Sequence, residues 1–151
     1  MMRVLDHFRS LNSRIGQDRL VGALHAMGEY QRVADLLERT GRTKDPRYYE
    51  AKAETTIGSD RVEWLHKLKD DRRVVQEYEN AGGNRWKDDI RKIVAKSYEN
   101  LKRFVESGRI YLDVKSYGEA GRVARSAIQS ARDDQSRATA YELVDQCAKA
   151  L

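Results

Sequence analysis

The chain has 151 residues, a formal net charge of +5 at pH 7, 40% hydrophobic residues and 35% charged residues. This length suits about one domain, and the composition is far from that of disordered chains. The single cysteine, Cys147, excludes an internal disulfide, and no apolar stretch approaches the ~18 residues of a membrane span. The N-terminus lacks the pattern of a secretory signal. We therefore expect one domain over residues 1–151, located in the cytoplasm.

Helix-forming residues dominate, and apolar residues recur at helical spacing from the N-terminus onward. Residues 3–12 predict a short amphipathic helix. Two further short helices are expected over residues 18–26 and 30–37, and they meet at Gly28. Gly41 stands where a helix favours a left-handed residue at its end.

Asp45 followed by Pro46 is a typical helix start, and the helix is expected to reach Ile57. Asp60 with Glu63 three positions later predicts a capping box, in which the two side chains cap each other's backbone N–H groups. A further short amphipathic helix should therefore begin at Asp60.

The next turn is indicated by the two glycines at 82 and 83, after a helical pattern that contains Val74, Val75 and Tyr78. Asn84 is expected to cap the helix that follows. That helix should run over residues 86–101 and carry a basic face.

The last third predicts helices over residues 101–114 and 118–131, with Ser116 and Glu119 as a second capping box. A final helix over residues 135–151 should pack on the others through one apolar face. The residues of this predicted face are Ala138, Tyr141, Val144, Cys147, Ala148 and Leu151.

Residues 27–39 and residues 114–127 share a sequence pattern. Each segment has a turn, then a tyrosine, then a helical face of small and apolar residues. Both segments resemble the turn and second helix of a tetratricopeptide repeat. Residues 101–134 resemble a whole unit of this family, whose period is about 34 residues. The positions that match are Phe104, Gly108, Tyr111, Tyr117, Ala120 and Ala127.

The resemblance is partial over residues 14–47 and 67–100. Within residues 101–134, Ala124 replaces a bulky residue, and Arg132 stands where the family often has proline. In this family small residues allow the two helices of a hairpin to approach closely, and aromatic residues fill the space between hairpins.

The resemblance implies an all-α fold, a right-handed stack of antiparallel helical hairpins over residues 14–134. A helix over residues 1–13 would precede the stack, and residues 135–151 would form a terminal capping helix.

The same resemblance implies a non-catalytic protein–protein interaction module, or a scaffold or assembly subunit, that binds a peptide or protein in the groove between first helices. Basic side chains in that groove would favour an acidic partner. The partner-binding residues that it implies are Lys69, Arg72, Arg73, Gln76, Lys102 and Arg109.

Residues with catalytic or metal-binding chemistry do not form a recognisable motif. The three histidines, His7, His25 and His66, have no close partner at metal-ligand spacing, so we expect no metal and no cofactor. Cys147 is expected to be a buried thiol. Adjacent aspartates occur three times at predicted helix starts, where they suit capping better than acid–base catalysis. The chain is therefore not expected to be an enzyme.

The alternative is a nucleic-acid-associated helical protein whose basic faces contact phosphates, which would make binding strongly salt-dependent. Trp86 could then stack on bases, although it also falls at a packing position. The basic residues concerned are Arg85, Lys87, Arg91, Lys92 and Lys96. The pattern is also compatible with self-association of the chain, and with a chain that forms the end of a longer solenoid. A membrane partner is not expected.

Overall fold

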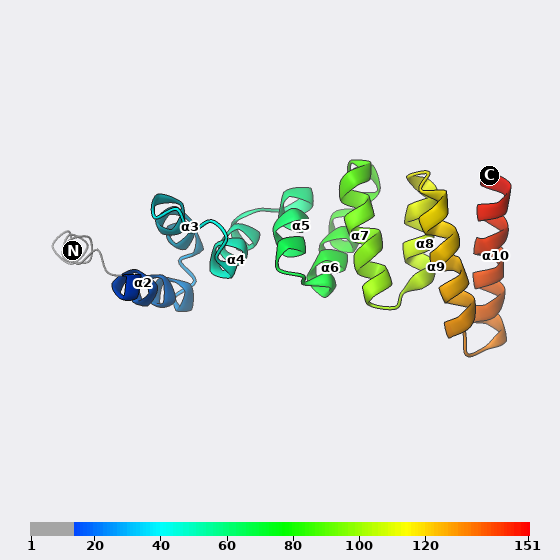
Figure 1. Cartoon of the computed structure of the whole chain (residues 1–151), viewed down its shortest axis with the longest axis horizontal. Helices are drawn as coiled ribbons and strands as arrows, with labels where there is room; N and C mark the ends of the chain where they lie inside the picture. Colours follow the sequence, from blue (N-terminus) through cyan, green and yellow to red (C-terminus); the bar gives the residue numbers. More distant parts are fainter. Residues whose placement is uncertain (1–13) are drawn as a thin grey trace. The chain divides into compact units, whose positions relative to one another are not determined.

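The computed structural model describes residues 14–151, which contain nine α-helices and one short 3-10 helix (Figure 1). No strand occurs within this range. The helix predicted over residues 3–12 lies outside it. The described chain divides into two compact units at the bond between Ile57 and Gly58, and we describe each unit by itself. A single domain over residues 1–151 stays a prediction.

The first unit contains α2 (Arg14–Ala26), α3 (Tyr30–Arg39) and α4 (Pro46–Thr55), and α3 packs on both of the others. Gly28 and Gly41 follow α2 and α3 with φ of 73° and 69°. This confirms the turn predicted at Gly28 and the left-handed residue predicted at Gly41. Within residues 14–57 the buried apolar side chains are Val21, Val33, Ala34, Leu37, Tyr48, Ala51 and Ala53.

The start of α4 is as predicted, because Pro46 is its first residue and the Asp45 carboxylate accepts a backbone N–H of its first turn at 2.9 Å. Its end is earlier than predicted. The hydroxyl of Thr55 donates to a carbonyl one turn back at 2.9 Å, and Thr56 is already extended, with φ −123° and ψ 166°. Ile57 therefore lies outside the helix and is 83% exposed.

The second unit is an unbroken succession of short helices (Figure 1). Each α-helix packs on the next, and in addition α5 contacts α7 and α8 contacts α10. The elements are α5 (Gly58–Lys67), α6 (Asp71–Ala81), the 3-10 helix Gly83–Arg85, α7 (Asp88–Asn100), α8 (Phe104–Asp113), α9 (Tyr117–Ser130) and α10 (Asp134–Ala150).

Small residues set the close spacing of the last helices. Gly108 of α8 is buried against Leu143 of α10, where an added Cβ would lie 2.5 Å from the Leu143 Cδ2 atom. The Ser107 hydroxyl donates to the Ala95 carbonyl at 2.7 Å, which holds α8 on α7. Buried alanines line α9, at positions 120, 124 and 127. Ala124, which stands where the resembling family has a bulky residue, is therefore part of the core.

Three of the turns between helices contain a lysine in the left-handed region. Lys69, Lys102 and Lys115 have φ of 56°, 61° and 61°. The backbone N–H of Lys69 donates to the His66 carbonyl at 2.9 Å. The backbone N–H of the next residue, Asp70, donates to the Leu65 carbonyl at 3.1 Å. The same two bonds recur at Lys102, at Lys115 and at Gly28. This pattern is the Schellman motif, so lysine stands where glycine is usual.

The two predicted capping boxes do not form. Because α5 already begins at Gly58, Asp60 lies inside its first turn rather than before it. Ser116 is the residue before α9, but its side chain accepts no capping hydrogen bond, and Glu119 pairs instead with Arg122 at 2.6 Å. The neighbouring arginine is a stronger partner for this carboxylate than a backbone N–H.

The predicted cap at Asn84 is also wrong. Asn84 lies in the 3-10 helix, and its side-chain oxygen accepts the Tyr78 hydroxyl at 3.1 Å. Trp86 is extended rather than helical and packs edge-on against Tyr78, with ring centroids 5.6 Å apart. The helix that follows therefore starts at Asp88. The next one, α8, starts at Phe104, because the residues before it form the left-handed turn.

The apolar face predicted for the last helix is wrong in register. The residues of α10 that are buried are Ala140, Leu143 and Cys147, whereas Tyr141 and Leu151 are 55% and 91% exposed. Because Leu143 packs against Gly108, the side of α10 that carries Leu143 is the buried side. The prediction that Cys147 is buried is confirmed, and this burial raises the pKa of its thiol.

Candidate functional site

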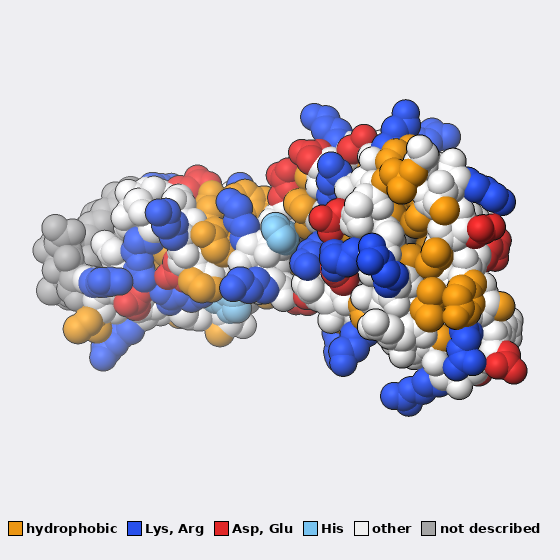
Figure 2. Space-filling model, turned by 45° about the vertical axis from the view of Figure 1, so that its right-hand side comes forward, with side chains coloured by type: hydrophobic (Ala, Val, Ile, Leu, Met, Phe, Trp, Pro, Cys, Tyr) orange, Lys and Arg blue, Asp and Glu red, His pale blue; other side chains and the backbone are white. Residues whose placement is uncertain are grey.

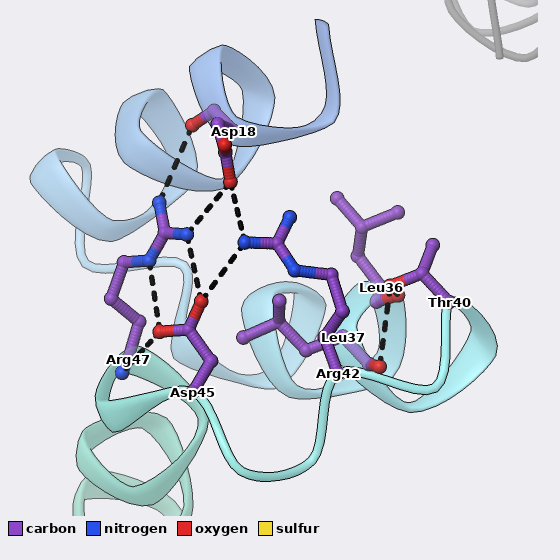
Figure 3. Close-up of polar contacts among 7 residues, drawn as sticks. All are labelled: Asp18, Leu36, Leu37, Thr40, Arg42, Asp45 and Arg47. Atoms are coloured by element: carbon purple, nitrogen blue, oxygen red, sulfur yellow. Dashed lines mark hydrogen bonds and ion pairs between the residues drawn. The ribbon is translucent and has the colours of Figure 1, made fainter. Parts of the chain in front are cut away.

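A cluster of four charged side chains in the first unit joins α2, the loop after α3, and the start of α4 (Figure 3). Asp18 Oδ1 lies 2.5 Å from Arg42 Nη2 and 2.9 Å from Arg47 Nη2. Asp45 Oδ2 lies 3.1 Å and 2.8 Å from the same two nitrogens. Each carboxylate therefore bridges both arginines. Because the four charges neutralise one another, this cluster fits a structural clamp better than a ligand site.

Replacing Asp45 with asparagine tests this clamp, since asparagine keeps the capping oxygen and removes the charge. Hydrogen bonds and charge from Arg47 lower the pKa of Asp45 from 3.8 to about 2. Because the pKa of Asp45 is lower in the folded protein than in the unfolded chain, its charge stabilises the folded state at pH values above 3.8. This stabilisation is lost as the pH falls toward 2. We expect Asp45→Asn to cost about 1–2 kcal/mol at pH 7 and much less at pH 2.5, measured by urea titration with circular dichroism.

The matched control for this measurement is Asp35→Asn, in the same unit. Among residues 14–151 the Asp35 carboxylate accepts a side-chain hydrogen bond from Gln31 alone, an exposed contact of 3.0 Å. Its replacement should change stability little at either pH. Equal losses for Asp45→Asn at both pH values would show that its charge does not stabilise the unit.

A larger candidate lies in the second unit, where the first turn of α8, the end of α9 and the first turn of α10 enclose a hollow of about 530 Å³. We call it the α8–α10 hollow. Phe104, Val105, Ala127 and Ala131 contribute its apolar lining. Two helix starts lie beside it and contribute partial positive charge, whereas the end of α9 contributes partial negative charge. The hollow therefore combines an apolar patch with polar side chains.

Four basic side chains also line the α8–α10 hollow. Arg103 pairs with Glu79 and Glu106, and the other three are Lys102, Arg109 and Arg132. Within residues 14–151 none of these other three makes a side-chain hydrogen bond or an ion pair. Of the two acidic residues there, Glu106 lies 3.4 Å from Arg103 in an exposed pair, and Asp133 accepts the Ser136 N–H at 2.7 Å. Basic side chains outnumber acidic ones at the hollow by four to two, so its side chains carry a net positive charge.

The six residues predicted to bind a partner do not share one hollow within residues 14–151. Lys102 and Arg109 line the α8–α10 hollow. Lys69 and Arg72 line a second hollow of about 370 Å³, and Lys69 lies in a turn. The remaining two, at positions 73 and 76, line a third hollow of about 130 Å³.

The sequence prediction did not include several residues of the α8–α10 hollow, among them Phe104, Arg132 and Thr139. The sequence pattern predicts a packing role for Phe104, which is half-buried. Arg132 stands out in the sequence because the resembling family often has proline there. Nothing in the sequence marks Thr139, since its place beside the hollow depends on how α10 docks.

The basic face proposed for nucleic acid is interrupted. Arg91 is buried and paired with Asp113, and Lys96 lies 3.2 Å from Glu99. Glu99 also accepts two hydrogen bonds from Arg122, at 2.7 and 2.8 Å, which hold the pKa of this carboxyl below its ordinary value. Figure 2 shows Lys and Arg interspersed with Asp and Glu on the face in view.

The paired aspartates lie at helix starts, as predicted. Asp70 and Asp133 each accept a backbone N–H of the helix that follows, at 3.2 and 2.7 Å, and Asp88 and Asp89 lie in the first turn of α7. Among residues 14–151 no group of three or more His, Cys, Asp or Glu side chains is placed to hold a metal ion. In the same range no helix has the length and apolar character needed to cross a membrane.

Comparison with protein-family models, with curated proteins and with solved structures gives no match. The geometry of the described residues is therefore the basis for the proposals that follow.

Proposed function

We propose that this chain is a non-catalytic interaction module, or a scaffold subunit, that binds an acidic peptide segment in the α8–α10 hollow. One observation carries the proposal: an apolar lining is flanked by three basic side chains that have no partner within the described residues. Charged side chains on a solvated face are usual, but here they surround a hollow with an exposed part of Phe104 in it.

The chemistry of the hollow suits a short extended segment. An apolar side chain of the peptide would cover Phe104 and Val105, which removes apolar surface from water. Carboxylates on either side of it would accept charge-assisted hydrogen bonds from Arg109 and Arg132. Both contacts are needed, because rim charges alone contribute little to affinity.

The finer architecture belongs to the same proposal. We propose that the hairpins form a right-handed, tetratricopeptide-like stack that works in the cytoplasm. The recurrence of the lysine turn 33 residues apart, at Lys69 before α6 and at Lys102 before α8, supports a repeated unit of two helices. Schellman turns reverse the chain within a few residues, as stacked hairpins require.

A random peptide library displayed on phage tests the proposal. We expect the full chain to enrich peptides with Asp or Glu beside an aromatic or aliphatic residue. The variant Lys102→Glu/Arg109→Glu should lose this enrichment, with binding of a selected peptide weakened at least tenfold, about 1.4 kcal/mol. The matched control is Lys92→Glu/Arg125→Glu, which makes the same charge change on exposed side chains of α7 and α9 outside the hollow.

Equal enrichment by both double variants would show that the α8–α10 hollow is not the binding site. The nucleic-acid alternative is separated by a titration with single-stranded RNA at several salt concentrations. RNA binding that falls steeply with salt and is lost in the α7/α9 control variant would favour that alternative.

A further inference from the structure

The last helix presents a second apolar face, away from the helices on which it docks. Its members are Ala138, Tyr141, Val144 and Ala148, at helical spacing along α10. Tyr141 is 55% exposed, and Val144 is half-buried. This face differs from the one that lines the α8–α10 hollow, to which α10 contributes Ser136 and Thr139. A large aromatic side chain in such a position is typical of a contact surface.

Charges flank this face in a pattern that is complementary to itself. Arg137 lies four residues before Tyr141, and Asp145 lies four residues after it. Further out, Asp133 lies eight residues before Tyr141 and Lys149 eight residues after it. Reversing the direction of the helix about Tyr141 therefore places every one of these charges opposite its counter-charge.

We propose that a second copy of this chain packs on this face, with the two α10 helices antiparallel and a two-fold axis at Tyr141. In this arrangement Arg137 of each copy meets Asp145 of the other, and Lys149 meets the acidic start of the other helix. Ala138 lies opposite Val144, so a small residue faces a larger one. A parallel pair would set like charges against each other. An isologous contact of this kind closes on itself and gives a dimer.

Three of the charges that form these contacts, at positions 137, 145 and 149, are only loosely engaged within one copy, whereas Asp133 also caps α10 through the Ser136 N–H at 2.7 Å. Arg137 lies 3.8 Å from Asp134 and Lys149 lies 3.4 Å from Asp145, and all four side chains are at least half exposed. Exposed pairs within one helix are weak and exchange partners at little cost. A single helix pair is a small interface, so we expect a dimer that forms in the micromolar range.

Sedimentation velocity of the full chain between about 1 and 300 μM tests the dimer, at concentrations that bracket the affinity expected for a small interface. We expect a rise in mass with concentration. Arg137→Asp and Asp145→Arg should each weaken the dimer at least tenfold, because each places two like-charged contacts in the interface. The double variant Arg137→Asp/Asp145→Arg restores opposite charges and should return the dissociation constant to within about threefold of the original, about 0.6 kcal/mol.

Arg125→Asp is the matched control, since it reverses an exposed arginine on α9 away from this face and should leave the dimer unchanged. Circular dichroism confirms that each variant keeps its helices. A chain that stays monomeric over the whole range overturns the proposal. So does a double variant as weak as the single variants, because this result removes the pairing between positions 137 and 145. These outcomes are separate from those of the peptide experiment, which concerns another face of α10.

Discussion

Shortening Leu65 to alanine should lower the free energy of unfolding of the second unit by about 3–5 kcal/mol. Leu65 lies on α5, is fully buried and is among the largest side chains with no exposed surface. Its truncation removes buried methyl groups and leaves a cavity that short helices held by tight turns cannot easily close. Urea titration followed by Trp fluorescence measures the loss, because Trp64 and Trp86 both lie in this unit.

Leu151→Ala is the control for that measurement, since it makes the same chemical change at a side chain that is 91% exposed. It should alter stability by less than about 0.5 kcal/mol. A loss below about 1 kcal/mol for Leu65→Ala would show that α5 does not pack as described.

Gly108→Val should cost about 2–3 kcal/mol, the range of an overpacked core. A Cβ at this position would lie 2.5 Å from Leu143 Cδ2 and 3.4 Å from its Cγ. Leu143 is only 2% exposed, so its side chain has little room to move. The hydrogen bond from Ser107 to the α7 backbone limits any shift of α8. Urea titration gives the loss, and faster hydrogen exchange in α10 should show where it acts.

The double variant Gly108→Val/Leu143→Ala tests the cause of this loss. If the two side chains collide, the space vacated by Leu143 accommodates the valine, and the double variant should be less destabilised than the sum of the single variants by at least about 1 kcal/mol. Additive losses would place the effect of the valine elsewhere in α8.

Most helices could be predicted from the sequence because their turns contain glycine, or aspartate followed by proline. Gly28, Gly41 and Asp45 act locally, through backbone conformation and capping, so they can be recognised without knowing the fold. The turns at Lys69 and Lys102 could not be predicted in the same way. Lysine has no preference for the left-handed region, and the packing of the flanking helices imposes it.

The face of α10 shows a different limit. Helical spacing predicts two overlapping apolar stripes on this helix, one through Leu143 and one through Tyr141. Which of them is buried depends on the space beside Gly108, on a helix about 30 residues earlier in the chain. Periodicity alone cannot choose between the two stripes, and the predicted choice was wrong.

The candidate site was predicted only in part, for a related reason. Its basic character, with Lys102 and Arg109, follows from the sequence. Its boundaries do not, because the hollow is made by three segments that meet in space, and Arg132 and Thr139 join it only through the docking of α10. Which basic residues are already paired is also a property of the fold, as Arg91 and Arg122 show.

We propose that the α8–α10 hollow binds an acidic peptide, and an amide NMR titration of the full chain with one acidic peptide from the phage selection tests this binding. We expect shift changes confined to residues 102–109 and 127–139, and none in the same titration of Lys102→Glu/Arg109→Glu. Shift changes centred on the exposed faces of α7 and α9, or equal changes in the double variant, would contradict it.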